Sequence, residues 1–389
     1  MSLTINDSTL SGRPPKQKLK DMLIVDVDVH VNETPAALAP YCEMPWRKSL
    51  EALIEVPQGY LNIPSYAQAQ SPWPIFPNSS GQRRKIVTSA KEMRKDLDDL
   101  GVDIGILFPD FFLFHAALQQ PDYAVALAKA YNRWLVEKWL SEDNNLKGAV
   151  LAPHHDPVAA AAEIRHYAKH KNVKAIYLPT AMVDPLYGHR RYDPVYEAAQ
   201  ETNLPVFFHS VTNVHPNFPF NMQGFTTLFS AHVLAHPFSC IANLLSMLET
   251  GVPVRFPNLR IAFTEAGIGW VPWIMLRIDK EYNERRRDLP FYNDRPSTYM
   301  KNMFFSTQPI EEPANLRELA TFLSLFDGEN SVIFSSDWPH HDFDHPSKIL
   351  QIPISDEARR KILGTNALRL LNLEGVVDEK QRSVSVESR

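Results

Sequence analysis

The chain has 389 residues, of which 44% are hydrophobic and 22% charged, and its formal net charge is −5. That charge excludes the basic field with which proteins bind nucleic acid or an anionic membrane. Cys42 and Cys240 are too few for a disulfide framework, and neither a signal peptide nor a membrane-spanning apolar run is visible. We therefore expect a cytoplasmic protein that binds neither nucleic acid nor membrane.

In chain order, a polar tail over residues 1–21 precedes eight short β-rich runs that are mostly followed by helical patterns. The predicted strands are Leu23–Val29, Ile104–Phe108, Gly148–Leu151, Ala175–Leu178, Val206–His209, Arg260–Phe263, Met303–Ser306 and Val332–Ser335. The predicted helices are Ala90–Leu100, Tyr123–Ser141, Pro157–His170, Asp193–Glu201, Ala231–Glu249 and Asp356–Leu371. A second polar tail covers residues 374–389. This alternation predicts an α/β fold, one (β/α)8 TIM-like barrel domain over residues 22–373.

Two connections are too long to be simple turns. Residues 31–89 and 210–230 are rich in proline and aromatic residues, and each follows a predicted strand. Loops that follow barrel strands rise above the C-terminal face, where long ordered loops usually serve binding. We expect 31–89 to be an insertion or lid over a pocket, although its aromatic rings would equally suit packing on the barrel rim.

The first strand carries polar side chains on one face. In I-V-D-V-D-V-H-V (24–31), strand alternation puts Asp26, Asp28 and His30 on the same side. Metal-ligating residue types also stand at the ends of strands five, six and eight, namely His209, Glu265 and Asp337. The short strand-end motifs hold no Lys or Arg, so buried acids there would lack a counter-charge. A divalent cation would supply it.

These motifs resemble the amidohydrolase superfamily, in its amidohydrolase-2 group related to aminocarboxymuconate semialdehyde decarboxylase. The resemblance rests on I-V-D-V-D-V-H (24–30), L-P-V-F-F-H-S (204–210), R-F-P-N-L-R-I-A-F-T-E-A-G-I-G-W-V-P (255–272) and F-S-S-D-W-P-H (334–340). It implies a distorted (β/α)8 barrel whose divalent metal is held by Asp28, His30, His209 and Asp337. Related barrels are usually dimers or larger, which implies a homo-oligomer.

Two positions depart from the family pattern, because Asp28 replaces a common first His and Glu265 replaces a common His after strand six. Both changes add hard oxygen donors, which favours Mn or Fe while leaving Zn open. A second ion would use Glu265, His236 or Asp26, although Asp26 is better suited to orient a ligand as a hydrogen-bond acceptor.

The resemblance leaves the reaction open. In a hydrolase acting on a small organic acid, amide or lactone, Asp337 would move a proton from metal-bound water, and Glu265 or His236 would polarise the substrate. In a non-oxidative decarboxylase, Asp337 would protonate the carbon that loses CO2. Residues that we expect to contact the substrate are His340, His155 and Trp338.

Two alternative functions would use the same residues. A non-haem mono- or dinuclear iron or manganese oxygenase would use His30, His209 and Asp337 as its facial ligands. Alternatively, the chain would be a metal-binding partner subunit in a hetero-oligomer with a related barrel subunit. Iron content and oxygen uptake would favour the first, and burial of the aromatic loops against another chain would favour the second.

Overall fold

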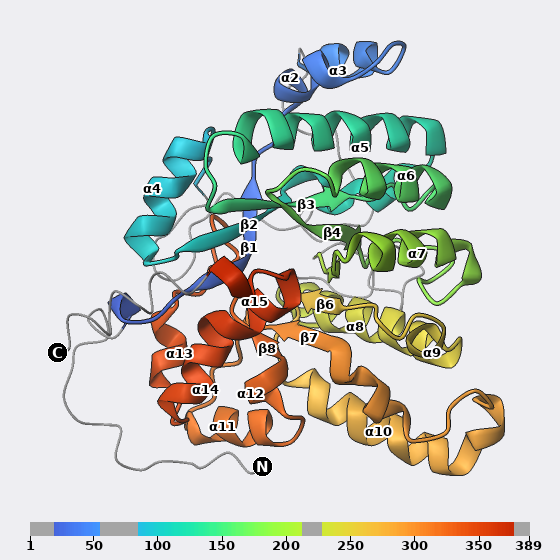
Figure 1. The fold of residues 1–389 in the computed structure, drawn as a ribbon, viewed down its shortest axis with the longest axis vertical. Helices are drawn as coiled ribbons and strands as arrows, with labels where there is room; N and C mark the ends of the chain where they lie inside the picture. The colour runs from blue at the N-terminus through green and yellow to red at the C-terminus, as the bar shows by residue number, and fades with distance from the viewer. Residues whose placement is uncertain (1–18, 55–84, 212–227, 377–389) are drawn as a thin grey trace.

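The structure is a computed structural model that describes residues 19–54, 85–211 and 228–376 (Figure 1). Most of both expected tails and the central parts of both long connections lie outside the described residues. At the described ends, Leu19 and Leu373 are buried in the core.

Eight parallel strands form one sheet in sequence order from β1 to β8. The strands are β1 Val25–Val31, β2 Ile104–Pro109, β3 Leu146–Leu151, β4 Val173–Pro179, β5 Val206–His209, β6 Ile261–Thr264, β7 Met303–Ser306 and β8 Val332–Ile333. Each begins and ends within two residues of its predicted position. The prediction of a (β/α)8 barrel is therefore confirmed.

Helices surround the sheet (Figure 1). The predicted helices correspond to α4 Ala90–Leu100, α5 Pro121–Leu135 with a π-helical turn at Val136–Leu140, α6 Pro157–Tyr167, α7 Asp193–Thr202 and α8 Leu228–Glu249. The last one is formed by α14 Asp356–Arg360, a π-helical turn at Lys361–Thr365 and α15 Asn366–Leu371. Within the described ranges, no helix has both the length and the apolar character to cross a membrane.

The sequence did not predict the two helices that follow β6 and β7, which are α10 Trp270–Arg285 and α11 Arg317–Ser324. In α10 the apolar stripe is blurred, because Trp273 and Leu276 are 58% and 67% exposed. Shorter helices are α2 Pro35–Leu38, α3 Arg47–Ile54, α9 Val252–Arg255, α12 Gly328–Ser331 and α13 Ser347–Gln351. The 3-10 turns are η2 Ala39–Tyr41, η4 Phe111–Ala117, η6 Arg190–Tyr192, η8 Arg286–Asp288, η9 Pro296–Asn302 and η11 Glu374–Val376.

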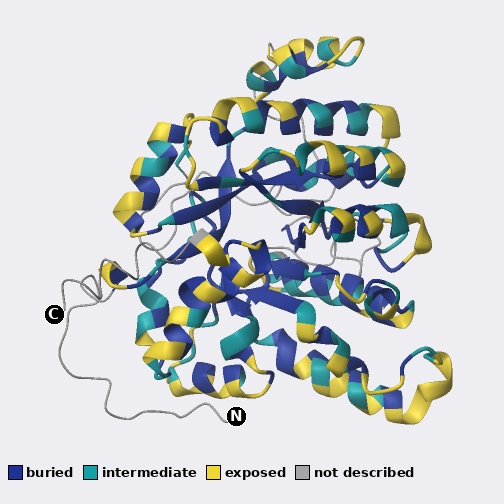
Figure 2. Cartoon of the chain, in the orientation of Figure 1, coloured by how far each residue is buried: buried dark blue, intermediate teal, exposed yellow. Residues whose placement is uncertain are grey.

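The core lies between the strands and the inner faces of the helices. Figure 2 shows buried strands at the centre and exposed residues on the outer sides of the helices. All seven residues of β1 are buried, including its acids and its histidine. Because both faces of a barrel strand are covered, near-continuous runs of Val, Ile and Phe are the sequence signature of this architecture.

Strand β8 has two residues, so the barrel closes through the chain that follows it. Val27 N donates to Phe334 O (3.1 Å), Asp337 N to Asp28 O (3.0 Å) and His30 N to Trp338 O (2.7 Å). Asp26 also stabilises this closure. Its carboxylate accepts from Asp28 N (3.1 Å), Ser336 N (2.9 Å) and Ser336 Oγ. The closure therefore depends on few hydrogen bonds, and Asp26 binds both of the segments that it joins, β1 and the chain after β8.

We expect Asp26→Ala to destabilise the protein by roughly 2–5 kcal/mol, because it leaves two buried N–H groups without acceptors at ~1–3 kcal/mol each. Asp26→Asn keeps an acceptor oxygen and should lose less. Thermal unfolding of the metal-free proteins, followed by circular dichroism, measures the difference. Equal midpoints for the two variants would contradict this role of Asp26.

The stability contribution of Asp26 should also depend on pH. Burial raises the pKa of Asp26 to about 7, although hydrogen bonds from Ser336 oppose the shift. The folded state therefore keeps a proton that the unfolded chain releases above about pH 4, so the contribution of Asp26 to stability falls as pH rises from about 4 to 7. Asp26→Asn lacks this titration. The unfolding midpoint of Asp26→Asn should therefore rise relative to that of the wild type between pH 4 and 7. A difference that stays constant with pH would contradict the raised pKa of Asp26.

Candidate metal centre

Four side chains meet at the C-terminal ends of the barrel strands. Asp28 Oδ1 lies 3.1 Å from His30 Nε2 and 2.9 Å from His209 Nε2, and His30 Nε2 lies 3.1 Å from Asp337 Oδ1. Ligand atoms about 2.1 Å from one first-row ion, at right angles to each other, are separated by roughly 3 Å. The four residues are at most 1% exposed. Asp28, His30 and His209 thus form one group that could hold a metal ion, and His30, Asp337 and His340 form a second group that shares His30 with it.

The closure of the barrel brings these residues together. Asp28 and His30 project from the same side of β1, and Asp337 joins them through the hydrogen bond from its N–H to Asp28 O. Asp337 has a φ of 64° and Glu265 a φ of 58°. Such left-handed backbone is uncommon outside glycine and concentrates at functional sites, where the surrounding structure holds it.

The hydrogen bonds of the two histidines leave their metal-facing nitrogens with lone pairs. His30 Nδ1 lies 2.7 Å from Pro109 O, and His209 Nδ1 lies 2.8 Å from Ser210 O. A carbonyl only accepts, so Nδ1 carries the proton in each neutral ring and Nε2 faces carboxylate oxygens with a lone pair. Within the described part of the chain, Asp28 Oδ2 has no hydrogen-bond partner. Buried lone pairs that converge in this way require a cation or extra protons.

The pKa shifts of these residues reflect burial on one side and the charges of their neighbours on the other. Burial acts to raise the pKa of Asp28, but His209 and His30 outweigh it and hold that pKa below its usual range. Asp28 in turn outweighs the effect of burial on His30 and raises its pKa well above the usual value. At Asp337, His340 and His30 together outweigh burial and lower the pKa. Without a metal, the acids therefore remain ionised and His30 holds a proton, which a bound cation would replace.

Glu265 and His236 lie on the far side of the His209 ring. Glu265 Oε2 is 3.4 Å from His209 Nδ1, whereas Asp28 contacts Nε2. His236, from α8, has Nδ1 2.8 Å from Glu265 O and 2.9 Å from Ser210 Oγ. Burial, with Asp337 and Asp28 nearby, raises the pKa of Glu265 well above its usual value. The two residues thus border the centre without joining its four-residue set.

His340 reaches the centre from the loop after β8. Its ring stacks on that of His30 with 4.3 Å between centroids, and its Nδ1 is 2.7 Å from Asp337 Oδ1. Its Nε2 is 3.3 Å from Asp110 Oδ1. A continuous line of titratable groups therefore runs from Asp337 through His340 to Asp110.

Three other sequence-predicted residues lie elsewhere. Both oxygens of Asp26 are engaged by the backbone closure described above. The Trp338 ring packs on Phe343, and its Nε1 donates to Asp96 (3.3 Å). His155 lies against His115 and His154, in a separate histidine cluster.

The sequence analysis missed Gln308, whose Nε2 donates to Asp337 Oδ2 at 3.1 Å. It also missed Asp110 and Ser210. All three directly follow or come soon after barrel strands, as Gln308 does in F-S-T-Q-P. His209 was found by looking for metal-ligating residues at strand ends. The same search would have found these three residues if it had included uncharged side chains and the ends of strands two and seven.

Fold and site together define the chain as a (β/α)8-barrel protein with a candidate metal centre at its C-terminal face. The amidohydrolase-2 family model, described as amidohydrolase, matches residues 25–373, so the chain belongs to this family and is an enzyme of the amidohydrolase superfamily.

Known relatives of the chain include decarboxylases. Gamma-resorcylate decarboxylase from Rhodococcus jostii (strain RHA1) is 25% identical over 283 residues, which cover 66% of this chain and 80% of the relative. The crystal structure of 2,6-dihydroxybenzoate decarboxylase from Rhizobium has a TM-score of 0.65 at 19% identity, covering 91% of this chain and all of the other. Dihydroxybenzoic acid decarboxylase from Polaromonas sp. JS666, with bound manganese and the inhibitor 2-nitroresorcinol, has a TM-score of 0.62 at 18% identity, covering 90% and 97%.

We expect His209→Ala and Asp28→Asn each to lower the manganese retained after reconstitution with Mn²⁺ and desalting by at least tenfold, because the first removes a ligand atom and the second removes the charge of a ligand. His166→Ala, at an exposed position on α6, serves as the control and should keep wild-type metal content. Elemental analysis gives the metal-to-chain ratio. Full metal content in His209→Ala would remove this residue from the ligand set.

Proposed function

We propose that this chain is a metal-dependent, non-oxidative decarboxylase of a small aromatic carboxylic acid. The observation that carries the proposal is the chain of three contacts, each 2.9–3.1 Å, that links two buried carboxylates and two imidazoles at the strand ends. The relatives named above are decarboxylases of aromatic acids, which supports carbon–carbon cleavage over hydrolysis and over oxygen chemistry.

Asp28, His30, His209 and Asp337 would hold one divalent cation. Two carboxylates neutralise its charge, and the mixture of hard oxygen and imidazole nitrogen donors suits Mn, Fe or Zn. When bound, the cation would offset the negative charge of the substrate's carboxylate and of an adjacent oxygen. A single ion is favoured because the oxygens of Asp26 are engaged elsewhere and Glu265 lies behind the His209 ring.

The reaction consumes one proton in each turnover. The bond between the ring carbon and the carboxylate breaks, CO2 leaves, and the electron pair stays on the carbon until a proton arrives. We assign this proton transfer to Asp337, because it combines burial with a direct neighbour that can resupply it. His340 Nδ1 lies 2.7 Å from Asp337 Oδ1, and its other nitrogen contacts Asp110. A substrate carboxylate placed nearby would raise the pKa of Asp337, as like charges do, and so favour its acidic form.

Gln308 has a positioning role in this scheme. Its side-chain N–H donates to Asp337 Oδ2, so one carboxylate oxygen is fixed while the other faces His30 and His340. The proposed mechanism requires neither the expected homo-oligomer nor the hetero-oligomer, and both remain predictions.

The experiment incubates the enzyme, reconstituted with Mn²⁺, with a panel of ortho-hydroxybenzoic acids in D2O. We expect CO2 release and one deuterium on the carbon that carried the carboxylate, as the proton balance requires. Oxygen uptake is recorded in parallel. Cleavage of amides or lactones without CO2 release from any acid would replace this proposal with a hydrolase, and substrate-dependent oxygen uptake would replace it with an oxygenase.

Asp337→Asn should lower the rate of CO2 release by about 10²–10⁴-fold, the usual contribution of a general acid or base. Asp294→Asn, at an exposed acid after α10, is the matched control and should keep wild-type activity. Metal content is measured in both variants, so that loss of the ion is separated from loss of the proton donor. An Asp337→Asn enzyme with full metal and full activity would move the proton transfer to another residue.

A further inference from the structure

A second group of histidines lies away from the carboxylate centre, in the loops after β2 and β3. His115 belongs to η4, and His154 and His155 belong to the segment between β3 and α6. The ring centroids are 4.0 Å apart for His154–His155, 5.1 Å for His115–His155 and 6.1 Å for His115–His154. One ring nitrogen from each residue lies within 4.8 Å of the other two.

His115 and His154 are buried and carry ring nitrogens that the described residues leave unpartnered. His115 is 1% and His154 5% exposed, and the Nδ1 atom of each has no hydrogen-bond partner within the described ranges. An unmet polar atom in such a place costs about 1–3 kcal/mol. His115 Nε2 lies 2.9 Å from Ala124 O, so it carries the ring proton and leaves a lone pair on Nδ1. A backbone carbonyl orients His30 of the carboxylate centre in the same way.

The three rings are neutral in the folded protein. Burial is the main cause, and it lowers the pKa of His115 to about 3 and of His155 to about 4. Burial and the neighbouring rings also lower the pKa of His154 well below its usual value. Neutral imidazole is the form that binds a metal, because its lone pair is not taken by a proton.

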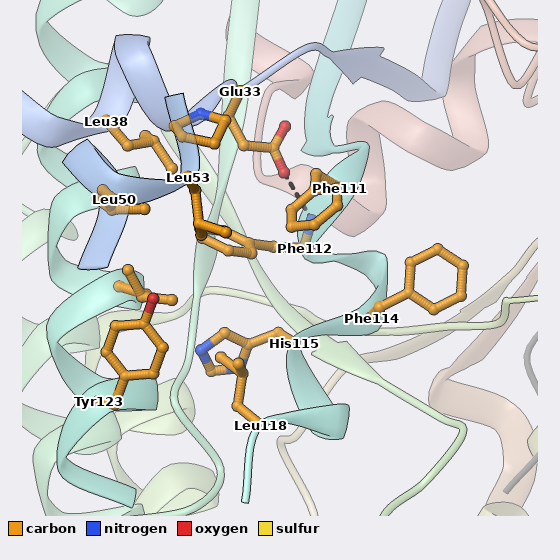
Figure 3. Close-up of a pocket in the computed structure, with 12 residues that line it drawn as sticks. Glu33, Leu38, Leu50, Leu53, Phe111, Phe112, Phe114, His115, Leu118 and Tyr123 are labelled. Carbon is orange, nitrogen blue, oxygen red and sulfur yellow. Dashed lines mark hydrogen bonds between the residues drawn. The ribbon is translucent and has the colours of Figure 1, made fainter. Parts of the chain in front are cut away.

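The loop that carries His115 is held in place. Glu33, which follows β1, accepts from Phe112 N at 2.6 Å and from Asp110 N at 3.1 Å. Figure 3 shows His115 among the residues that line an apolar cavity of about 130 Å³ between α2, α3 and η4, on the opposite side from Glu33. His115 therefore projects from a fixed turn toward the edge of this cavity.

We infer that His115, His154 and His155 form a second metal site, which binds Zn²⁺. The set consists of three imidazoles, the ligand type that suits zinc, and a tetrahedral ion would keep its fourth position for water. Nitrogens around such an ion are roughly 3.3 Å apart, given bonds of about 2.0–2.1 Å, so side-chain movements of about 1 Å would close the set. The ion would join the loop after β2 to the loop after β3.

The two sites differ in chemistry, which makes them separable. The carboxylate centre offers oxygen and nitrogen donors and suits harder ions, whereas the histidine cluster offers nitrogen alone. Mn²⁺ should therefore occupy the first site and leave the second to zinc. The inference does not depend on the proposed decarboxylation, because its test counts metal ions rather than turnover.

The test strips the purified protein with chelator, saturates it with Zn²⁺, desalts it and measures zinc per chain. We expect about two zinc ions in the wild type, about one in His154→Ala, about one in His209→Ala and none in the double variant, because each substitution removes a ligand from one site. His166→Ala, the exposed control, should keep about two. Circular dichroism of the stripped proteins shows that each variant is folded.

Two results would overturn the inference: His154→Ala holding as much zinc as the wild type, or zinc in His209→Ala being lost on desalting as adventitious ions are. His155→Gln is the second variant, at a half-buried position that tolerates substitution better, and it should lose the same ion. If His209→Ala instead kept both ions while His154→Ala lost one, His209 would be removed from the ligand set of the carboxylate centre and the histidine site would stand. Cu²⁺ bound to His209→Ala should show nitrogen coupling by electron paramagnetic resonance, and its absence would contradict a site of imidazoles.

Discussion

Three backbone hydrogen bonds join β1 to the chain after β8, and the rest of the site depends on them. They run from Val27 to Phe334, from Asp337 to Asp28 and from His30 to Trp338. Since β8 itself has two residues, these bonds and the Asp26 carboxylate close the barrel. Asp26 and Ser336 are 310 positions apart in the chain, so their contact exists only when the whole barrel has formed. The metal centre therefore requires the closed barrel.

Closing the barrel in this way creates an electrostatic problem. Two carboxylates and two imidazoles converge in a buried position, and carbonyls at Pro109 and Ser210 fix both rings with Nε2 directed inward. Burying such groups unpaired is costly, and a divalent cation resolves the conflict for all of them together. In the proposed decarboxylase, the same arrangement would place Asp337, supplied through His340, where a proton is needed.

With both proposed sites, the barrel would carry two kinds of metal chemistry on one face. Carboxylates enter the centre from β1 and from the chain after β8, whereas His115 and His154 come from the loops after β2 and β3. The loop after β2 is held by Glu33, which accepts from Phe112 N. A site rich in oxygen donors and a site of imidazoles select different ions, because ligand hardness differs more between them than ligand number.

The sequence by itself determined the eight strands, the barrel and the four strand-end residues, since alternation along β1 and the position of a residue at a strand end are local properties. It did not predict α10, whose apolar residues lie on exposed as well as buried faces. Tertiary structure alone decided that Asp26 braces the closure, that Glu265 lies behind the His209 ring and that His155 joins His115 instead of the centre. The physical reason is that these roles depend on which residues meet across the barrel, and contacts between distant parts of a chain leave no local pattern in it.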